Sequence, residues 1–152
     1  MARKQKMMAV ASEGGHFVQL MRLRPAFEGM ETVYVSTNPG LASAFELNNF
    51  RVLPDANMDK KAKLLWVLIR AFFLVLKERP THVVSTGAAP GFAVLACARL
   101  LGAKTIWIDS IANADELSAA GAKAKYVAHH WLTQWEHLTK EYPGLEYKGR
   151  VI

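Results

Sequence analysis

Short apolar runs alternate with longer segments of helical periodicity along this chain. Runs that are rich in Val and Ile, and almost unbroken in hydrophobicity, are typical of parallel strands covered on both faces. The pattern predicts strands at residues 7–11, 32–36, 51–53, 82–85, 104–108, 126–128 and 147–152. It predicts helices at residues 15–28, 40–48, 60–78, 90–101, 115–123 and 134–141. Strands that alternate with helices through right-handed crossovers form a Rossmann-like α/β fold, a parallel sheet with helices on both faces.

The length and composition of the chain bound its organisation. Its 152 residues are 51% hydrophobic and 21% charged, which suffices for one domain with a core of its own. No internal repeat, low-complexity segment or linker interrupts the pattern, so we expect residues 1–152 to form a single domain. The net charge of +6 suits an anionic partner: a phosphorylated ligand, an anionic membrane surface or nucleic acid. The single cysteine, Cys97, excludes a disulfide within the chain and fits a cytoplasmic protein.

Two glycine-bearing turns, each between a predicted strand and a predicted helix, are the main candidate binding elements. Such a turn exposes backbone N–H groups at a helix N-terminus, where an anion is stabilised. Neither turn matches a dinucleotide fingerprint or a P-loop. The glycines of either turn, taken alone, could serve only to make a tight connection between strand and helix. Two turns at one sheet edge nevertheless predict a ligand with more than one anionic group. The candidate residues are Ser12, Gly14, Gly15, Ser85, Thr86 and Gly87.

Two residues beside these turns could do acid–base chemistry. His16 lies in the first helical turn after the first strand, and Asp109 directly follows the strand at 104–108. Ligands of open α/β sheets bind at the carboxyl ends of the strands, where both residues are expected. Ser110 and Asn113 in the Asp109 loop are further candidates for binding sugar hydroxyls. His16 could equally be an ordinary helix-start residue, and Asp109 or Ser110 a helix cap.

The helix predicted at residues 60–78 is apolar around its centre and basic at its ends. Such a helix fits the headgroup region of an anionic membrane, and the alternatives are a core helix or a partner interface. Its apolar stretch of thirteen residues, Leu64–Leu76, contains Arg70 and is shorter than the roughly 18 residues that a membrane span needs. The predicted membrane contacts are Lys63, Trp66, Arg70, Phe72, Phe73 and Lys77.

Other chemistry receives little support from the sequence. His129, His130, His137 and Cys97 lack the spacing of a metal-ligand set, so the histidine pair is interpreted as structural and no metal or cofactor is expected. Basic residues are not interleaved with aromatic residues outside the long helix, so no nucleic-acid partner is expected.

The motifs together resemble a known family. They are Ser12-x-Gly14-Gly15-His16, Ser85-Thr86-Gly87 with Pro90, the Asp109 loop, Gln134-Trp135-x-x-Leu138 and Tyr147-x-Gly149-Arg150. In these the chain resembles the acceptor-side subunit of the two-component N-acetylglucosaminyltransferase that adds the second sugar to the dolichol-linked oligosaccharide. It is also similar to bacterial counterparts in capsule and exopolysaccharide assembly. More distantly, it is similar to the N-terminal half of the lipid II-forming glycosyltransferase.

The resemblance implies the N-terminal, acceptor-binding half of a GT-B glycosyltransferase, held peripherally at the cytoplasmic face of a membrane. The glycine turns would bind the diphosphate of a polyprenyl-diphosphate-linked acceptor, and a separate donor-binding subunit would hold the UDP-sugar. His16 or Asp109 would deprotonate the acceptor hydroxyl for an inverting transfer, and the chain alone would be inactive. The family often has Glu where Asp109 stands, and Glu13 would repel a phosphate unless it points away. A non-catalytic membrane adaptor and a stand-alone nucleotide-binding module are the alternative hypotheses.

Overall fold

The computed structural model describes residues 4–151, and these residues share one parallel sheet. The sheet has seven strands in the order β3-β2-β1-β4-β5-β6-β7, and every neighbouring pair is parallel. The strands are β1 Lys6–Ala11, β2 Glu31–Ser36, β3 Phe50–Val52, β4 His82–Gly87, β5 Lys104–Ile108, β6 His130–Thr133 and β7 Glu146–Tyr147. The chain order reverses direction between β1 and β4, so the carboxyl ends of these two strands form the topological switch point.

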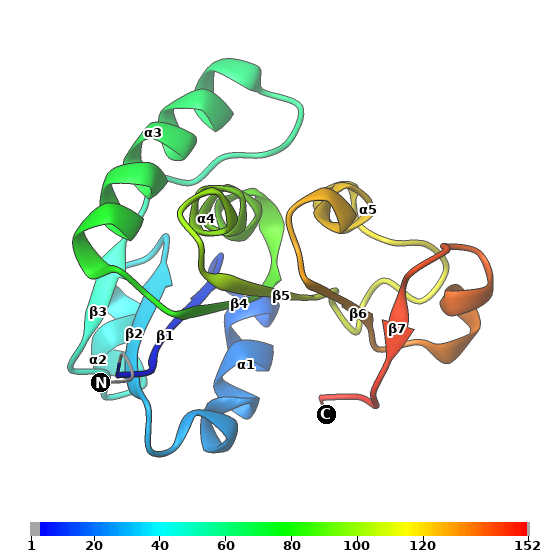
Figure 1. Cartoon of the computed structure of the whole chain (residues 1–152), viewed down its shortest axis with the longest axis horizontal. Coiled ribbons are helices and arrows are strands. Elements are labelled where there is room, and N and C mark those ends of the chain that lie inside the picture. Colours follow the sequence, from blue (N-terminus) through cyan, green and yellow to red (C-terminus); the bar gives the residue numbers. More distant parts are fainter. Residues whose placement is uncertain (1–3, 152) are drawn as a thin grey trace.

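Helices cover both faces of this sheet (Figure 1). The α-helices are α1 Gly15–Arg22, α2 Gly40–Ala44, α3 Lys61–Glu78, α4 Ala88–Leu100 and α5 Ala119–Lys123. Short 3-10 helices follow at Arg24–Phe27, Ala124–Tyr126 and Glu136–Lys140. Helices α3, α4 and α5 lie on one face, and α1 and α2 lie on the other. The predicted Rossmann-like α/β fold is therefore confirmed.

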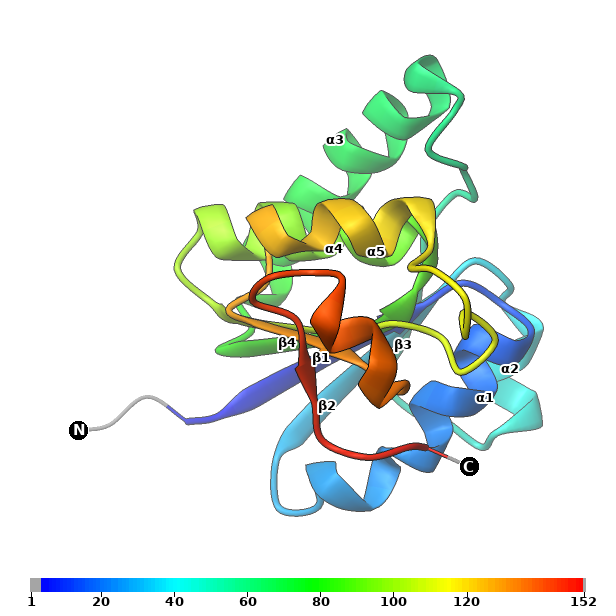
Figure 2. The same cartoon turned by 90° about the vertical axis from the view of Figure 1, so that its right-hand side faces the viewer.

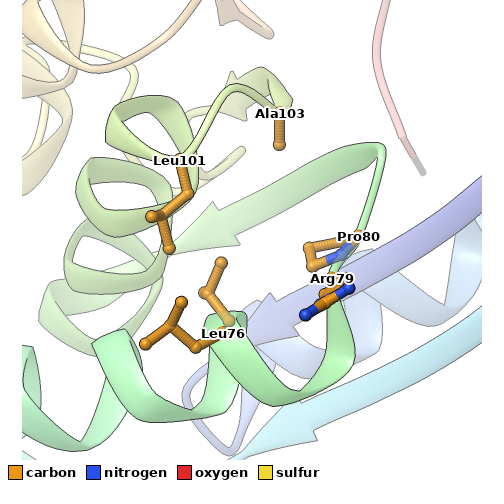
Figure 3. Close-up of a pocket in the computed structure, with 6 residues that line it drawn as sticks. Leu76, Arg79, Pro80, Leu101 and Ala103 are labelled. Carbon is orange, nitrogen blue, oxygen red and sulfur yellow. The ribbon is translucent and has the colours of Figure 1, made fainter.

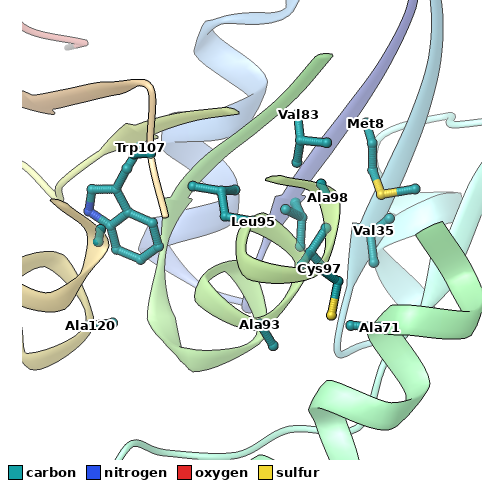
Figure 4. Close-up of a cluster of buried hydrophobic side chains, with 14 of the residues drawn as sticks. Met8, Val35, Ala71, Val83, Ala93, Leu95, Cys97, Ala98, Trp107 and Ala120 are labelled. Carbon is teal, nitrogen blue, oxygen red and sulfur yellow. The ribbon is translucent and has the colours of Figure 1, made fainter. Parts of the chain in front are cut away.

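Each face of the sheet has its own apolar core because side chains alternate along each strand. Met8 and Val10 of β1 point toward α3 and α4, whereas Met7 and Ala9 point toward α1. The larger core centres on α4, and Trp107 and Leu95 are fully buried in it (Figure 4). Cys97, also on α4, is buried in the same core.

Several predicted elements differ from the observed ones at their boundaries. The helix predicted at 15–28 ends at Arg22, and a 3-10 turn containing Pro25 follows because proline has no N–H to continue the helix. The helix predicted at 115–123 begins only at Ala119, where Ser118 caps it, and the one predicted at 40–48 ends at Ala44. The segment predicted as a helix at 134–141 forms the 3-10 helix Glu136–Lys140. The last predicted strand is observed only as β7, and Ile152 lies outside the described residues.

The strand predicted at residues 126–128 is wrong. The N–H groups of Val127 and Ala128 both donate to the carbonyl of Ala124, so this apolar run closes the turn after α5. Strand β6 begins at His130 instead, and it pairs with β5 through Ile106 and His130. No helix among residues 4–151 is both long and apolar enough to cross a membrane.

Candidate functional site

The first glycine turn leads from β1 directly into the first turn of α1. Gly14 precedes the helix with a φ of +82°, a conformation that favours glycine, and no side chain caps this helix end. A Cβ atom at either Gly14 or Gly15 would meet no atom within 4 Å. The backbone at this helix N-terminus is therefore open to a ligand, as the anion-binding prediction requires.

His16 joins this turn to the second one. Its Nδ1 lies 3.3 Å from the carbonyl oxygen of Thr86, and the hydroxyl of Thr86 donates back to the carbonyl of His16 over 2.6 Å. Strand β4 shifts its register against β1 at this point, where Val10 pairs with Ser85 but Ala11 pairs with Gly87. The irregularity brings the two glycine turns together at the switch point.

Gly87 is the residue that makes room for the imidazole. A Cβ atom at position 87 would collide with Nδ1 of His16, and the φ of Gly87 is +147°. The next residue, Ala88, has a φ of +69°, which is unusual for a residue with a side chain. Strained backbone of this kind clusters at ligand sites, where the surrounding fold holds it in place.

The contact with Thr86 has a chemical consequence for His16. When the carbonyl oxygen of Thr86 accepts a hydrogen bond, Nδ1 carries the proton and Nε2 keeps its lone pair. His16 is only partly buried, so this lone pair can act as a general base toward a ligand at the switch point.

Ser85 and Thr86 shape the second turn from inside the fold. Both side chains are fully buried, and the Ser85 hydroxyl accepts a hydrogen bond from the N–H of Gly87 over 3.2 Å. A Cβ atom at Gly91 in α4 would overlap this hydroxyl, so α4 packs directly on it. Ser12 is also nearly buried, whereas Gly14 and Gly15 of the first turn are exposed. The open backbone of the predicted anion site is thus at Gly14 and Gly15.

Asp109 is positioned as a structural residue rather than as a base. Its side chain is 1% exposed. Its carboxylate accepts hydrogen bonds from the indole of Trp107 at 3.2 Å, the amide of Asn113 at 3.2 Å, and both the N–H and the hydroxyl of Ser118 at 3.1 and 2.7 Å. With four donors around it, the carboxylate has no free lone pair for an acceptor hydroxyl. These contacts favour a structural role for Asp109 over a catalytic one, whereas Asn113, which is partly exposed, stays a predicted sugar ligand.

A buried pair of glutamines, which the sequence did not single out as site residues, connects this loop to α1. The amide of Gln134 donates to the side-chain oxygen of Gln19 over 2.6 Å and to the carbonyl of Asp109 over 3.0 Å. Gln19 in turn donates to the hydroxyl of Ser110 over 3.1 Å. Ser110 is therefore part of the same internal network. The sequence signalled this glutamine pair only through Gln134, as a family motif residue.

Glu13 points away from the open backbone of the first turn. Its carboxylate accepts a hydrogen bond from the side-chain amide of Asn38 over 2.8 Å, and its N–H donates to the hydroxyl of Thr37 over 3.4 Å. Both partners belong to the loop after β2. The hydrogen bond to Asn38 thus holds the Glu13 carboxylate at the neighbouring loop.

Helix α3 buries one side and exposes an apolar surface on the other, here called the α3 outer face. Val67, Ala71 and Val75 pack into the core. Side chains at helical spacing on the opposite side are strongly exposed: Leu65 59%, Trp66 51%, Ile69 42%, Phe73 63% and Leu76 42%. Because these side chains are exposed, the alternative of a helix buried on both sides is wrong.

The predicted membrane contacts fall only partly on this face. Trp66 and Phe73 lie on it, whereas Phe72 is half-buried with its ring edge against Phe73. The sequence missed Leu65, Ile69 and Leu76, because a helix that is apolar all round does not reveal which side faces the core. Lys63, Arg70 and Lys77 are exposed along one flank of the face, seven residues apart. The first turns of α3 rise beyond the other helices (Figure 2).

Two further features lie away from the switch point. A cavity of about 280 Å³ between the C-terminal ends of α3 and α4 is lined by Leu76, Pro80 and Leu101, at the amino end of the sheet (Figure 3).

His129 is held by the sheet. Its Nδ1 accepts a hydrogen bond from the N–H of Thr105 over 3.0 Å. Burial lowers the pKa of His129, and the positive charge of Arg99 lowers it further. Among residues 4–151, no group of three or more His, Cys, Asp or Glu side chains could hold a metal ion.

Comparison with known proteins gives a family match. The family model described as "Oligosaccharide biosynthesis protein Alg14 like" matches residues 30–151. The UDP-N-acetylglucosamine transferase subunit ALG14 of Mus musculus is 23% identical over 182 residues, which cover 97% of this chain and 83% of the relative. The Candida albicans subunit of the same name is 32% identical over 84 residues, covering 51% of this chain and 38% of the relative.

Solved structures share the fold. MurG of Acinetobacter baumannii superposes with a TM-score of 0.75 at 15% identity, covering 97% of this chain and 45% of MurG. UDP-N-acetylglucosamine 2-epimerase of Rickettsia bellii gives a TM-score of 0.70 at 14% identity, covering 98% of this chain and 46% of the epimerase. The chain thus spans about half the length of these structures, in agreement with the expected half of a GT-B architecture.

Proposed function

Because this chain belongs to the family of Alg14-like oligosaccharide biosynthesis proteins, we propose that it is the acceptor-binding subunit of a glycosyltransferase. The enzyme transfers a sugar from a UDP-sugar, with inversion, to a polyprenyl-diphosphate-linked acceptor in exopolysaccharide or capsule assembly. A separate subunit binds the donor, and the chain alone is inactive. The names of its relatives, which are transferase subunits, support the division between two polypeptides.

The observation that supports this proposal most directly is the contact between His16 and Gly87 at the switch point. The open N-terminus of α1 at Gly14 and Gly15 offers N–H groups to the diphosphate of the acceptor. The imidazole of His16 stands beside these groups, with its Nδ1 held by the carbonyl of Thr86. An anion site beside an oriented base is what an acceptor-binding half requires.

In the proposed reaction, Nε2 of His16 takes the proton of the acceptor hydroxyl. The hydroxyl oxygen then forms a bond to the anomeric carbon of the donor sugar from the side opposite UDP. The bond from that carbon to the β-phosphate oxygen breaks, and UDP leaves with the bonding electrons. Groups of the donor-binding subunit meet the charge on UDP, while this chain orients the acceptor and holds the proton.

The α3 outer face supports a peripheral position on the membrane that contains the acceptor lipid. Trp66 and Phe73 would enter the headgroup region, and Lys63, Arg70 and Lys77 would lie at the level of anionic headgroups. We propose the cytoplasmic surface as the location, because UDP-sugar donors are expected there.

Reconstitution tests the proposed function. The tagged chain is purified alone from a foreign host, and in parallel from its own host with the proteins that accompany it. Each sample is mixed with radiolabelled UDP-N-acetylglucosamine, UDP-glucose, UDP-galactose or UDP-glucuronic acid and a polyprenyl-diphosphate-linked sugar. Label is expected in the lipid fraction only with the accompanied sample. Transfer by the chain alone would contradict the division of the site between two subunits.

A further inference from the structure

A shallow cavity of about 250 Å³ opens between the edge strand β3 and the flank of α3, on the opposite side of α3 from α4. Three basic side chains line it, and the rest of its wall is apolar. The basic residues are Arg51, Arg70 and Lys77, and the apolar ones include Val52, Phe73 and Leu74. A cavity that combines clustered positive charge with an apolar wall fits a ligand that is anionic at one end and apolar at the other.

The three cations differ in how the protein already uses them. Arg51 donates from Nε to the carboxylate of Glu78 and from Nη1 to the carbonyl of Phe50, both over 2.9 Å, which fixes its guanidinium in place. Arg70 and Lys77 make no ion pair with any residue of the described part of the chain, and both are exposed. Arg70 lies over the ring of Trp66 at 5.7 Å. Two cations beside an anchored third are thus available to an outside anion.

Phe73 connects the cavity to the α3 outer face. This side chain is 63% exposed and belongs to both surfaces. Val52 on β3, which is 42% exposed, extends the apolar surface across the cavity to the sheet edge. A ligand whose phosphate reached the basic residues could therefore lay its hydrocarbon chains over Phe73 without leaving the protein surface.

We propose that this cavity, here called the β3–α3 cavity, binds the headgroup phosphate of an anionic membrane lipid. The phosphate pairs with Arg70 and Lys77 while Arg51 supplies the anchored charge, and the acyl chains extend from Phe73 into the bilayer. The proposal rests on the membrane position proposed above and adds a defined lipid site to it. Charge complementarity with a continuous apolar surface favours a lipid over an acidic peptide, which would leave the apolar wall uncovered.

The test compares two pairs of substitutions, one in the cavity and one on other elements of the fold. Arg70→Gln with Lys77→Gln removes two charges from the cavity, and Lys123→Gln with Lys140→Gln removes two charges from exposed lysines of α5 and the 3-10 helix Glu136–Lys140. Binding is measured by sedimentation with vesicles of phosphatidylcholine alone and with vesicles that also contain phosphatidylglycerol. Each basic residue near an anionic surface contributes about 1 kcal/mol, so the cavity pair should bind the anionic vesicles about 30-fold more weakly. The outside pair should lose less than about threefold.

The outcomes separate this site from the general membrane proposal. Equal losses in both pairs would mean a diffuse surface charge, and unchanged binding in the cavity pair would remove the site; either result overturns the inference. If the chain does not lie on a membrane at all, the unmodified chain itself will not bind the vesicles. Inorganic phosphate should compete no better than chloride at equal ionic strength. If it displaces the vesicles selectively, the ligand is free phosphate and the lipid assignment is wrong.

Discussion

The imidazole of His16 occupies the space that a side chain at position 87 would fill. One residue comes from the turn after β1 and the other from the end of β4, so the contact joins the two glycine turns across the switch point. The position of the proposed base therefore depends on the absence of a side chain 71 residues away along the sequence.

Gly87→Ala is expected to displace His16 and to strain the backbone, because the φ of Gly87 is +147°. The cost in unfolding free energy should be about 1–3 kcal/mol, and transferase activity should fall more than stability explains. Gly102→Ala is the matched control, since Gly102 also has a positive φ but has open space around its Cβ position. Thermal unfolding and the activity of the two-subunit enzyme are measured on both variants. Equal activity in both would show that the His16 position does not matter.

His16→Ala should lower turnover by about 10²- to 10⁴-fold if the imidazole is the general base. His16→Gln is the informative companion, because glutamine can still donate to the Thr86 carbonyl but cannot take a proton at neutral pH. Both variants should remain assembled with the donor-binding subunit. Turnover unchanged in His16→Ala, with assembly intact, would favour the adaptor hypothesis. Recovery in His16→Gln alone would indicate a positioning role.

Asp109→Asn should destabilise the fold without changing the chemistry of the folded enzyme. The amide group would face donors that now bond to the carboxylate, including Trp107 and Ser118. The expected loss is about 2–4 kcal/mol of unfolding free energy, measured by denaturant titration. The turnover per folded molecule, and its dependence on pH, should stay as in the unmodified enzyme. A folded variant that has lost turnover would restore Asp109 as a catalytic residue.

Trp66→Glu with Phe73→Glu should abolish sedimentation with both neutral and anionic vesicles, because it places two charges on the α3 outer face. Leu100→Glu with Tyr126→Glu is the matched control. It introduces the same charges at side chains that are 78% and 71% exposed on other elements. If the α3 variant still sediments with vesicles, that face contacts a protein partner instead of a membrane.

The buried carboxylate of Glu78 should make stability depend on acid. Burial alone would raise its pKa, but hydrogen bonds and attraction from Lys6 and Arg51 outweigh burial and lower it. A lowered folded-state pKa means that the stabilisation is complete above the ordinary value near 4.5 and is lost as pH falls through the folded value. Glu78→Gln should therefore be less stable than the unmodified chain at pH 7, and the difference in unfolding free energy should shrink toward pH 3. A difference that does not change with pH would contradict this account.

The sheet and the two turns were predictable from sequence because their signals are local. Unbroken apolar runs define β1, β2, β4 and β5, and glycines after β1 mark the first turn. The displacement of β6 was not predictable from hydrophobicity, because Val127 and Ala128 are as apolar as a strand but serve to close the turn after α5. Their hydrogen bonds to the carbonyl of Ala124 make this segment a turn, and such bonds cannot be inferred from the amino-acid composition of the segment.

The candidate site was less predictable because its geometry depends on distant contacts. An aspartate after a strand has the same sequence signature whether it faces a ligand or four internal donors, so the sequence does not reveal the internal hydrogen bonds of Asp109. The His16 orientation depends on the register shift of β4, which no local pattern reveals. Gln19 was missed because a polar residue in a helix reads as exposed until its partner Gln134 is placed beside it.

The glutamine pair has a consequence for the thermodynamics of binding. Helix α1 carries His16 in its first turn and Gln19 one turn later, and each is bonded to a different part of the sheet. The helix is thus pinned on both sides of the switch point before any acceptor arrives. As the proposed base, an imidazole held this firmly would lose little conformational entropy when the proposed acceptor binds, so the binding energy of that acceptor would remain available to orient its hydroxyl.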